Sequence, residues 1–221
     1  MHPLPPLSLL ETRVLGVLVE KQHTVPDSYP LTLNAIVSGC NQKTARDPVI
    51  EAGDAEVQST LDHLKSMALV VESSGGRVMR YAHNVERVLG LPSQAVALLA
   101  TLMLRGPQTL GELRINSDRL HRFADISAVD AFLQELAARP SGAMVAELPR
   151  SPGSRESRWM HLLSGARPPE SVPSDGSAPL AGDVVTLTEI AALKANVRHL
   201  EEELETLKRT VANLRSELGG T

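Results

Sequence analysis

The apolar positions of the first 163 residues recur in the same pattern twice. Three apolar runs at helical spacing predict three helices in each copy. The runs fall at residues 10–18, 33–36 and 57–64 in the first copy and at residues 96–103, 110–113 and 129–136 in the second. Ser8 and Thr109 are each followed three residues later by a glutamate, which predicts capping boxes at two helix starts. Asp54 and Ser127 are the predicted N-caps of the two third helices.

A short segment with turn and strand signals follows the third helix of each copy. The segments from Gly75 to His83 and from Gly153 to His161 lie 78 residues apart and share two arginines, an aromatic residue and a histidine in register. Alternation along a strand favours inward-facing Tyr81 and Trp159, and the alternative is that the shared residues form a recognition feature.

Three helices followed by a hairpin are typical of the winged-helix form of the helix-turn-helix. The sequence therefore predicts a mainly α protein with small β-hairpin wings (α+β), with one winged-helix domain at residues 7–88 and a second at residues 89–163. The run from Ala95 to Leu104 is apolar on nearly every face, so we expect it to be covered on both sides. It lies either between the two winged helices or in a subunit interface.

The last quarter of the chain has a different pattern. Residues 164–185 are rich in Pro, Gly, Ser and Ala and predict a linker, and residues 186–218 follow with apolar positions alternately three and four residues apart. This heptad pattern predicts a coiled-coil helix, and β-branched residues at its a positions with Leu at d favour a parallel homodimer. The predicted dimerisation seam consists of Ile190, Leu193, Val197, Leu200, Leu204, Leu207, Val211, Leu214 and Leu218. The alternative is that this helix folds back onto its own globular part.

Charge and composition limit which partners and which cellular compartment are expected. The formal net charge of −4 gives no global basic field that would attract nucleic acid. The single cysteine, Cys40, excludes a disulfide within one chain, favours the cytoplasm, and is predicted to be a small buried residue. The longest apolar stretch is too short to cross a bilayer, so no membrane partner is expected.

Motifs for catalysis are absent from the sequence. It contains no GxGxxG, GxxxxGK[ST], GxSxG or HExxH pattern, and none of its seven histidines forms an i, i+4 pair. We therefore expect no enzyme activity, no cofactor and no metal site.

Basic residues suggest where an anionic partner would bind. The predicted third helices carry carboxylates at exposed positions, which disfavours the usual docking of such a helix in the major groove. Lysines and arginines lie instead in the preceding loops and in the hairpins. The candidate nucleic-acid contacts are Lys43, Arg46, Arg77, Arg80, Arg114, Arg119, Arg122, Arg150, Arg155 and Arg158. This number permits salt-dependent DNA binding, and the alternative is that neighbouring carboxylates pair with them.

Three separated stretches are distinctive: PLTLNAIVSGCNQKTARDPV (Pro30 to Val49), LRGPQTLGELR (Leu104 to Arg114) and LPRSPGSRESRWMHLLSG (Leu148 to Gly165). Together they resemble the YceH family of uncharacterised bacterial proteins. The resemblance covers most of residues 8–165 and implies tandem winged helices, without an established activity, substrate or catalytic residue. Residues 113–119 are less basic than is usual in that family, which weakens an anion-binding role there.

Three functional hypotheses follow. The first is a non-enzymatic cytoplasmic scaffold or regulatory module, dimerised by its coil. The second, which is the main alternative, is a DNA-binding transcriptional regulator that contacts DNA through the wings and the arginine-bearing loops. The third is recognition of a protein alone, in which the acidic third helices would meet a partner with a basic groove.

Overall fold

The structure of this chain is a computed structural model that describes residues 4–73, 78–150 and 156–165. All of these residues belong to one compact unit that extends from Met1 to Val172. The predicted linker from residue 166 onward and the predicted coil, with every residue of its seam, lie outside the described residues. Arg77 and Arg155 also lie outside them.

The first half of the unit contains helices and one small sheet. Its elements are α1 (Leu9–Thr24), a short 3-10 helix (Pro26–Ser28), β1 (Leu31–Thr32), α2 (Leu33–Cys40), α3 (Asp54–Ser66), β2 (Val70–Ser73) and β3 (Arg80–His83). The strands form an antiparallel sheet in the order β1-β3-β2, in which Leu31 pairs with Tyr81 and Val70 pairs with His83.

The second half repeats this order of elements. A short helix, α4 (Val85–Leu89), leads to α5 (Ser93–Arg105), α6 (Leu110–Asn116), α7 (Ile126–Ala137), β4 (Val145–Glu147) and β5 (Trp159–His161). The two strands are antiparallel, and Val145 pairs with His161. An isolated antiparallel bridge from Gln108 to Trp159 stands where β1 stands in the first half, between the first and second helices. Neither β1 nor this bridge is predicted by the sequence pattern.

The helix starts are partly as predicted. Both capping boxes are confirmed, at Ser8 of α1 and at Thr109 of α6. The predicted N-caps of the third helices are wrong by one or two residues. The α3 helix begins at Asp54 itself, after Gly53, whose backbone N–H donates to the Glu56 carboxylate at 2.8 Å. The α7 helix is capped by Asp125 rather than Ser127, because the Asp125 carboxylate accepts from the Ala128 N–H at 2.8 Å.

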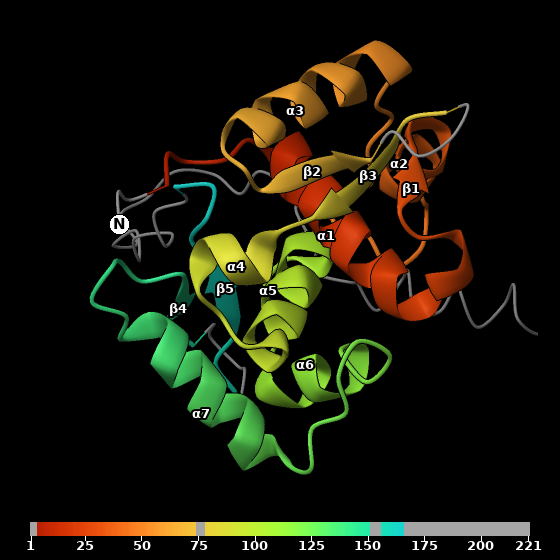
Figure 1. Cartoon of the computed structure of the whole chain (residues 1–221). Coiled ribbons are helices and arrows are strands. Elements are labelled where there is room, and N and C mark those ends of the chain that lie inside the picture. Colours follow the sequence, from red (N-terminus) through yellow and green to blue (C-terminus); the bar gives the residue numbers. More distant parts are fainter. Residues whose placement is uncertain (1–3, 74–77, 151–155, 166–221) are drawn as a thin grey trace, which may run out of the picture. The chain divides into compact units, whose positions relative to one another are not determined.

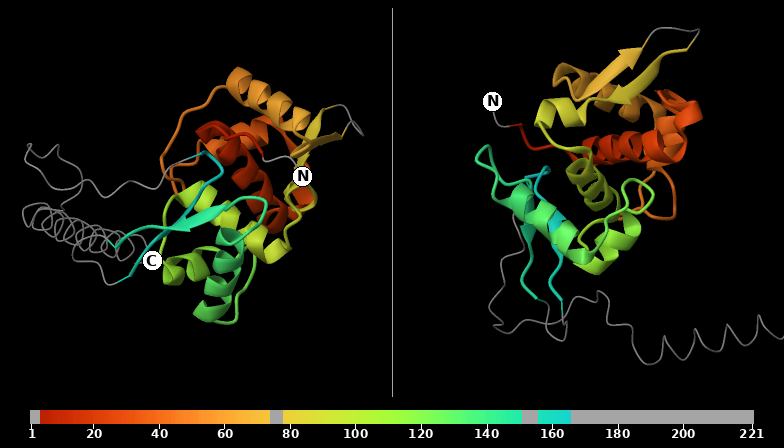
Figure 2. Two further views of the ribbon diagram at one scale, coloured as in Figure 1. Left: turned by 90° about the vertical axis from the view of Figure 1, so that its left-hand side faces the viewer. Right: turned by 60° about the horizontal axis from the view of Figure 1, so that its bottom comes forward.

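One hydrophobic core joins the two halves. Every residue from Ala95 to Leu104 in α5 is buried, and this helix packs against α1 on one side and α7 on the other. This helix therefore lies between the two halves, which is one of the two positions that the sequence predicts for it. The close approach of α1 to α5 depends on Gly16, since a Cβ atom there would lie 2.9 Å from the Leu104 side chain. Figures 1 and 2 show α1 and α5 in the middle of the unit, with α3 and α7 at opposite ends.

The described residues thus form a mixed α and β structure in which helices predominate over two small antiparallel sheets. Tyr81 and Trp159 face inward and are 4% and 3% exposed, as strand alternation predicted. Cys40 is also buried, as expected of a small apolar residue. Among the described helices, none combines the length and the apolar character needed to cross a bilayer.

Candidate functional site

The predicted basic residues fall into three groups with different surroundings. Arg46 is buried, and the other described candidates are exposed in the loops or around the hairpins. The exposed candidates are Lys43, Arg80, Arg114, Arg119, Arg122, Arg150 and Arg158.

Arg46 is a correction to the predicted set. Its side chain is only 1% exposed and forms a paired contact with Glu20, with Nη1 3.1 Å and Nη2 2.6 Å from the two carboxylate oxygens. Its Nε donates to the carbonyl of Gly39 at 3.0 Å, and Nη2 also donates to the side-chain oxygen of Gln42. A guanidinium buried in such a network holds the α2–α3 loop against α1 and cannot reach a phosphate in solution.

Three exposed arginines lie on α6 or in the segment that follows it, and we call them the arginine corner (Arg114, Arg119 and Arg122). Arg122 pairs with Asp118 at 3.2 Å and is 83% exposed, so this ion pair contributes little to stability. Arg114 donates to the carbonyl of Ala124 at 3.2 Å. Arg119 makes no hydrogen bond or ion pair with a described residue. Ile115, which lines a pocket with Arg114 and Arg122, is 74% exposed.

The arginines of the two hairpins are tied to the backbone in an equivalent way. Arg80 of β3 donates to the carbonyls of Ser28 and Pro30, at 3.2 and 2.8 Å. Arg158, 78 residues later, donates to the carbonyl of Pro107 at 2.9 Å and pairs with Glu112 at 3.3 Å. Both side chains remain exposed, but part of their donor capacity serves to fasten the hairpin to the segment before the second helix.

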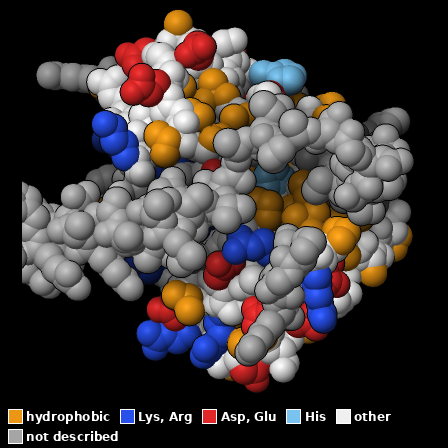
Figure 3. All heavy atoms as spheres, turned by 180° about the vertical axis from the view of Figure 1, so that it is seen from behind, with side chains coloured by type: hydrophobic (Ala, Val, Ile, Leu, Met, Phe, Trp, Pro, Cys, Tyr) orange, Lys and Arg blue, Asp and Glu red, His pale blue; other side chains and the backbone are white. Residues whose placement is uncertain are grey.

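The exposed faces of the third helices are acidic in both halves. The α3 helix carries Asp54, Glu56 and Asp62 against Lys65, a net charge of −2 with histidine neutral. Lys65 itself is paired with Asp62 and Glu72. The α7 helix carries two carboxylates and no lysine or arginine, so its net charge is also −2. Figure 3 shows acidic side chains gathered at the top of the view, where α3 lies, and a mixture of basic and acidic side chains along the lower edge.

Sequence reasoning missed a buried arginine in α1. Arg13 is fully buried within the apolar run of that helix and donates to the carbonyls of Cys40 and Pro48, at 3.1 and 2.6 Å. The only sequence signal is the presence of a charged residue inside an apolar stretch. Arg13 joins α1 to the end of α2 and to the loop beyond it, which is a structural role.

The groups whose pKa is displaced furthest are displaced by burial. Burial raises the pKa of the Cys40 thiol to about 12, which leaves it protonated and unreactive at neutral pH. Burial lowers the pKa of His83 and of His161 to about 4, with a smaller contribution from His23 at His83. These two histidines hold equivalent positions in the two hairpins, and each has a buried Nδ1 without a hydrogen-bond partner. Both imidazoles are therefore neutral at pH 7.

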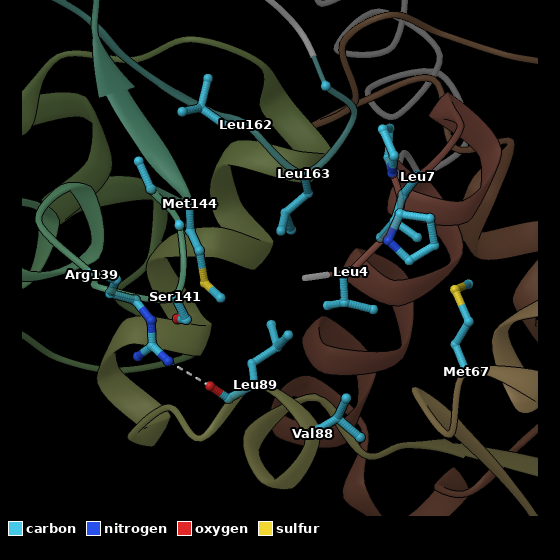
Figure 4. A pocket seen from close by; sticks show the side chains of 15 residues that line it. Leu4, Leu7, Met67, Val88, Leu89, Arg139, Ser141, Met144, Leu162 and Leu163 are labelled. Carbon is cyan, nitrogen blue, oxygen red and sulfur yellow. Dashed lines mark hydrogen bonds between the residues drawn. The ribbon is translucent and has the colours of Figure 1, made fainter. Parts of the chain in front are cut away.

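An apolar cavity of about 490 Å³ lies among the N-terminal segment, α4, the α7–β4 loop and the end of β5. Figure 4 shows Leu89 and Leu163 on opposite sides of the hollow, with Leu4 and Met144 beside them. Its charged lining residue is Arg139, which donates to the carbonyl of Leu89 at 2.8 Å. The size is that of pockets for small molecules, roughly 300–1,000 Å³. The lining offers apolar contact and one cation, without paired acid and base groups.

Within the described residues, no three histidine, cysteine or carboxylate side chains are grouped so that they could hold a metal ion.

Fold and surface together define a protein of mixed α and β structure, with a duplicated order of elements, two acidic helix faces and an arginine corner in its second half.

Comparison with known proteins shows the family. A family model described as "Protein of unknown function, DUF480" matches residues 7–154. A UPF0502 protein of Dechloromonas aromatica (strain RCB) is 59% identical over 204 residues, which cover 92% of this chain and 93% of that protein. A UPF0502 protein of Burkholderia pseudomallei (strain 668) is 56% identical over 213 residues, which cover 96% of this chain and 89% of that protein. The chain belongs to the DUF480 (UPF0502) family of uncharacterised bacterial proteins.

Proposed function

We propose that this chain is a non-enzymatic cytoplasmic interaction protein that presents the acidic faces of its third helices to a protein partner with a basic surface. It consists of two winged helices, at residues 7–88 and 89–163, and a coiled coil at residues 186–218 that makes it a homodimer. The resemblance to the YceH family belongs to the same proposal.

The order of elements supports the two winged helices. In a winged helix, a short strand stands between the first and second helices and pairs with the hairpin that follows the third helix. In the first half β1 stands there and pairs with β3. In the second half the bridge from Gln108 to Trp159 has the same place. Both halves therefore have a third helix that is followed directly by the hairpin.

The observation that carries the proposal is the net charge of −2 on each third helix. In a DNA-binding winged helix this element enters the major groove, where its side chains meet bases and phosphates. Carboxylates on that face are repelled by phosphates and attract a cationic protein surface, which steers association and excludes wrong partners. Lys65 is already counted in the net charge of α3, and its pairs with Asp62 and Glu72 together with the contact of His63 to Glu11 leave no further positive charge on this helix.

The test compares protein capture by two variants of the full chain that remove equal charge. The first, Asp54→Asn with Asp62→Asn, neutralises the α3 face and leaves the Glu56 cap intact. The second, Asp27→Asn with Glu86→Gln, removes two exposed carboxylates elsewhere. We expect the wild type and the second variant to retain the same partner from a bacterial extract, and the first variant to lose it. Equal capture by both variants would contradict a role for α3.

DNA binding is the second candidate, because of the arginine corner. Arg114, Arg119 and Arg122 are exposed on the half whose hairpin also carries Arg150 and Arg158. Replacing the corner by alanines, or replacing Arg77, Arg80, Arg155 and Arg158 of the wings, should lower the affinity for a labelled duplex and flatten its salt dependence. Fluorescence anisotropy at about 50 mM and about 200 mM salt measures both effects. Wild-type protein that fails to bind at the lower salt concentration excludes this candidate.

The proposed homodimer is tested separately. Light scattering of the full chain should give the mass of two chains, and a chain that ends at residue 165 should give the mass of one. The coil would act by holding two weak binding surfaces together, which raises their effective concentration without a new contact. A monomeric full chain would remove the dimer from the proposal and leave the helix surfaces unaffected.

A further inference from the structure

A polar cleft of about 250 Å³ lies on a different part of the unit from the apolar cavity. Its walls come from both halves: the end of α1 and the α2–α3 loop on one side, and the ends of α5 and α6 on the other. Three cationic side chains line it, Lys21 from α1, Arg105 from α5 and Arg119 from the segment after α6. Gln42 and Thr44 add neutral polar groups from the loop.

The charge in this cleft is unbalanced. Glu20 is its one carboxylate among the described lining residues, and both of its oxygens are already bonded to Arg46, at 3.1 and 2.6 Å. Lys21 lies 3.2 Å from the same carboxylate. Arg105 and Arg119 make no hydrogen bond or ion pair with any described residue. Two arginines without a partner among the described residues therefore line one small cleft.

The floor of the cleft is fixed in place by buried contacts. Arg46, whose side chain is 1% exposed, holds Glu20 and donates to the side-chain oxygen of Gln42. Lys21 donates to the same Gln42 oxygen at 3.4 Å. The side-chain oxygen of Gln42 accepts both bonds. The amide N–H groups of Gln42 make no hydrogen bond with a described residue, so they remain able to donate.

We propose that this cleft binds a phosphate group. Guanidinium groups match the oxygens of phosphate with paired, charge-assisted hydrogen bonds, and a lysine adds a point charge. The volume lies below the range of roughly 300–1,000 Å³ that drug-sized ligands occupy, which fits a phosphate, a pyrophosphate or a small phosphorylated metabolite. This inference goes beyond the proposed function and does not depend on it, because α3 and α7 contribute no lining residue.

Because the cleft lies between the two halves, a bound ligand should stabilise the folded protein. Lys21 belongs to the first half, and Arg105 and Arg119 belong to the second, so one bound phosphate group joins the two halves. A ligand that binds only the folded chain stabilises it by mass action. We therefore expect pyrophosphate to raise the unfolding temperature of the protein.

Isothermal titration calorimetry of the full chain with pyrophosphate, at constant ionic strength, tests the site. Arg105→Gln and Arg119→Gln should each weaken binding by at least about tenfold, since each removes charge-assisted hydrogen bonds. Arg114→Gln and Arg122→Gln are the controls: they make the same charge change on α6 and in the segment after it, at residues that do not line the cleft, and should leave the affinity for pyrophosphate nearly unchanged. The unfolding temperature without ligand checks that every variant is folded.

Two results overturn the proposal: no saturable binding of pyrophosphate, or an equal loss of affinity in the cleft variants and in the controls, which would indicate general attraction of anions. A competition experiment then identifies the source of the phosphate group. If pyrophosphate displaces a labelled duplex and Arg119→Gln weakens both ligands, the phosphate belongs to a nucleic acid. If pyrophosphate binds and the duplex does not compete, the ligand is a small free phosphate compound.

Discussion

The two halves of the unit use the basic residues after their second helices in opposite ways. In the first half, Arg46 is buried and bonded to Glu20 near the end of α1. In the second half, Arg119 and Arg122 occupy the corresponding loop and are exposed. The ends of the first helices account for the difference, because α1 offers a carboxylate to the loop and α5 ends in Arg105, which repels a second guanidinium.

This comparison shows that position in a repeat does not decide the role of a charged residue. In the first half, a buried ion pair holds the loop between the second and third helices. In the second half, the corresponding loop leaves Arg119 without a partner among the described residues. The half with the buried pair supplies the rigid wall of the polar cleft, and the half without it supplies the unpartnered donors. Removal of each arginine should therefore affect a different property, stability in the first half and binding in the second.

The largest predicted effect is on stability. Arg46→Met should lower the free energy of unfolding by about 3 kcal/mol, because the mostly buried Glu20 would keep Lys21 as its one cationic partner and the bonds of Arg46 to Gly39 and Gln42 would be lost. Arg119→Met, a matched change in the second half, should stay within about 0.5 kcal/mol of the wild type. Urea unfolding followed by circular dichroism measures both.

A double variant separates the ion pair from general packing. Adding Glu20→Gln to Arg46→Met removes the carboxylate charge and should recover part of the lost stability. Equal losses for Arg46→Met and Arg119→Met would show that the two loops do not differ in the way their burial indicates.

The next prediction concerns a property that the halves share. The pKa of His83 and of His161 is lowered to about 4 by burial, from an ordinary value of 6.5. Between these values the unfolded chain binds protons that the folded chain does not, so stability is complete above pH 6.5 and falls as the pH drops toward 4. A shift of this size corresponds to about 3 kcal/mol for each histidine.

Urea unfolding at pH 7 and pH 5 tests this expectation. His83→Gln and His161→Gln should each remove part of the loss of stability between these two pH values, and the double variant should remove most of it. Glu11 and Glu20 do not interfere: burial alone would raise the pKa of each carboxyl, but their hydrogen bonds lower it, so their contributions are lost only below about pH 4.5. An unchanged pH dependence in the double variant would contradict the assignment.

Features that depend on residues a few positions apart in the sequence could be predicted from the sequence alone. The capping boxes at Ser8 and Thr109 and the inward-facing Tyr81 and Trp159 follow from spacing over a few residues. Arg46 could not be separated from Arg119 in this way, because its partner Glu20 lies 26 residues earlier and is brought close only by packing of the loop against α1.

Contacts with backbone carbonyls and across helices also have no local signal. Arg13 donates to two carbonyl groups, which every residue possesses, so nothing in the sequence marks its partners. The polar cleft has the same limitation. Lys21, Arg105 and Arg119 come from three elements that are brought together when α1 packs on α5.

A pair of glycine substitutions should have opposite signs in the two halves. A Cβ atom at Gly39 of α2 would lie 2.6 Å from Val17 Cγ1, so Gly39→Ala should cost about 1–3 kcal/mol through overpacking. At Gly111 of α6 no atom lies within 4 Å of the added Cβ, so Gly111→Ala should raise stability by about 0.4–1 kcal/mol through the unfolded chain. Thermal unfolding of the two variants under identical conditions measures both changes, and a stabilising Gly39→Ala would contradict close packing of α2 against Val17.

The two capping boxes should differ least in their effect on stability. The hydroxyl oxygens of Ser8 and Thr109 each accept from a backbone N–H at 3.2 Å, so Ser8→Ala and Thr109→Ala should each cost about 1 kcal/mol. The two glutamates of the boxes differ in their other partners, since Glu11 is buried and contacts His63 whereas Glu112 pairs with exposed Arg158. If urea unfolding shows equal costs, the caps act locally. A larger cost for Ser8→Ala would contradict this expectation and would mean that the buried Glu11 depends on its cap.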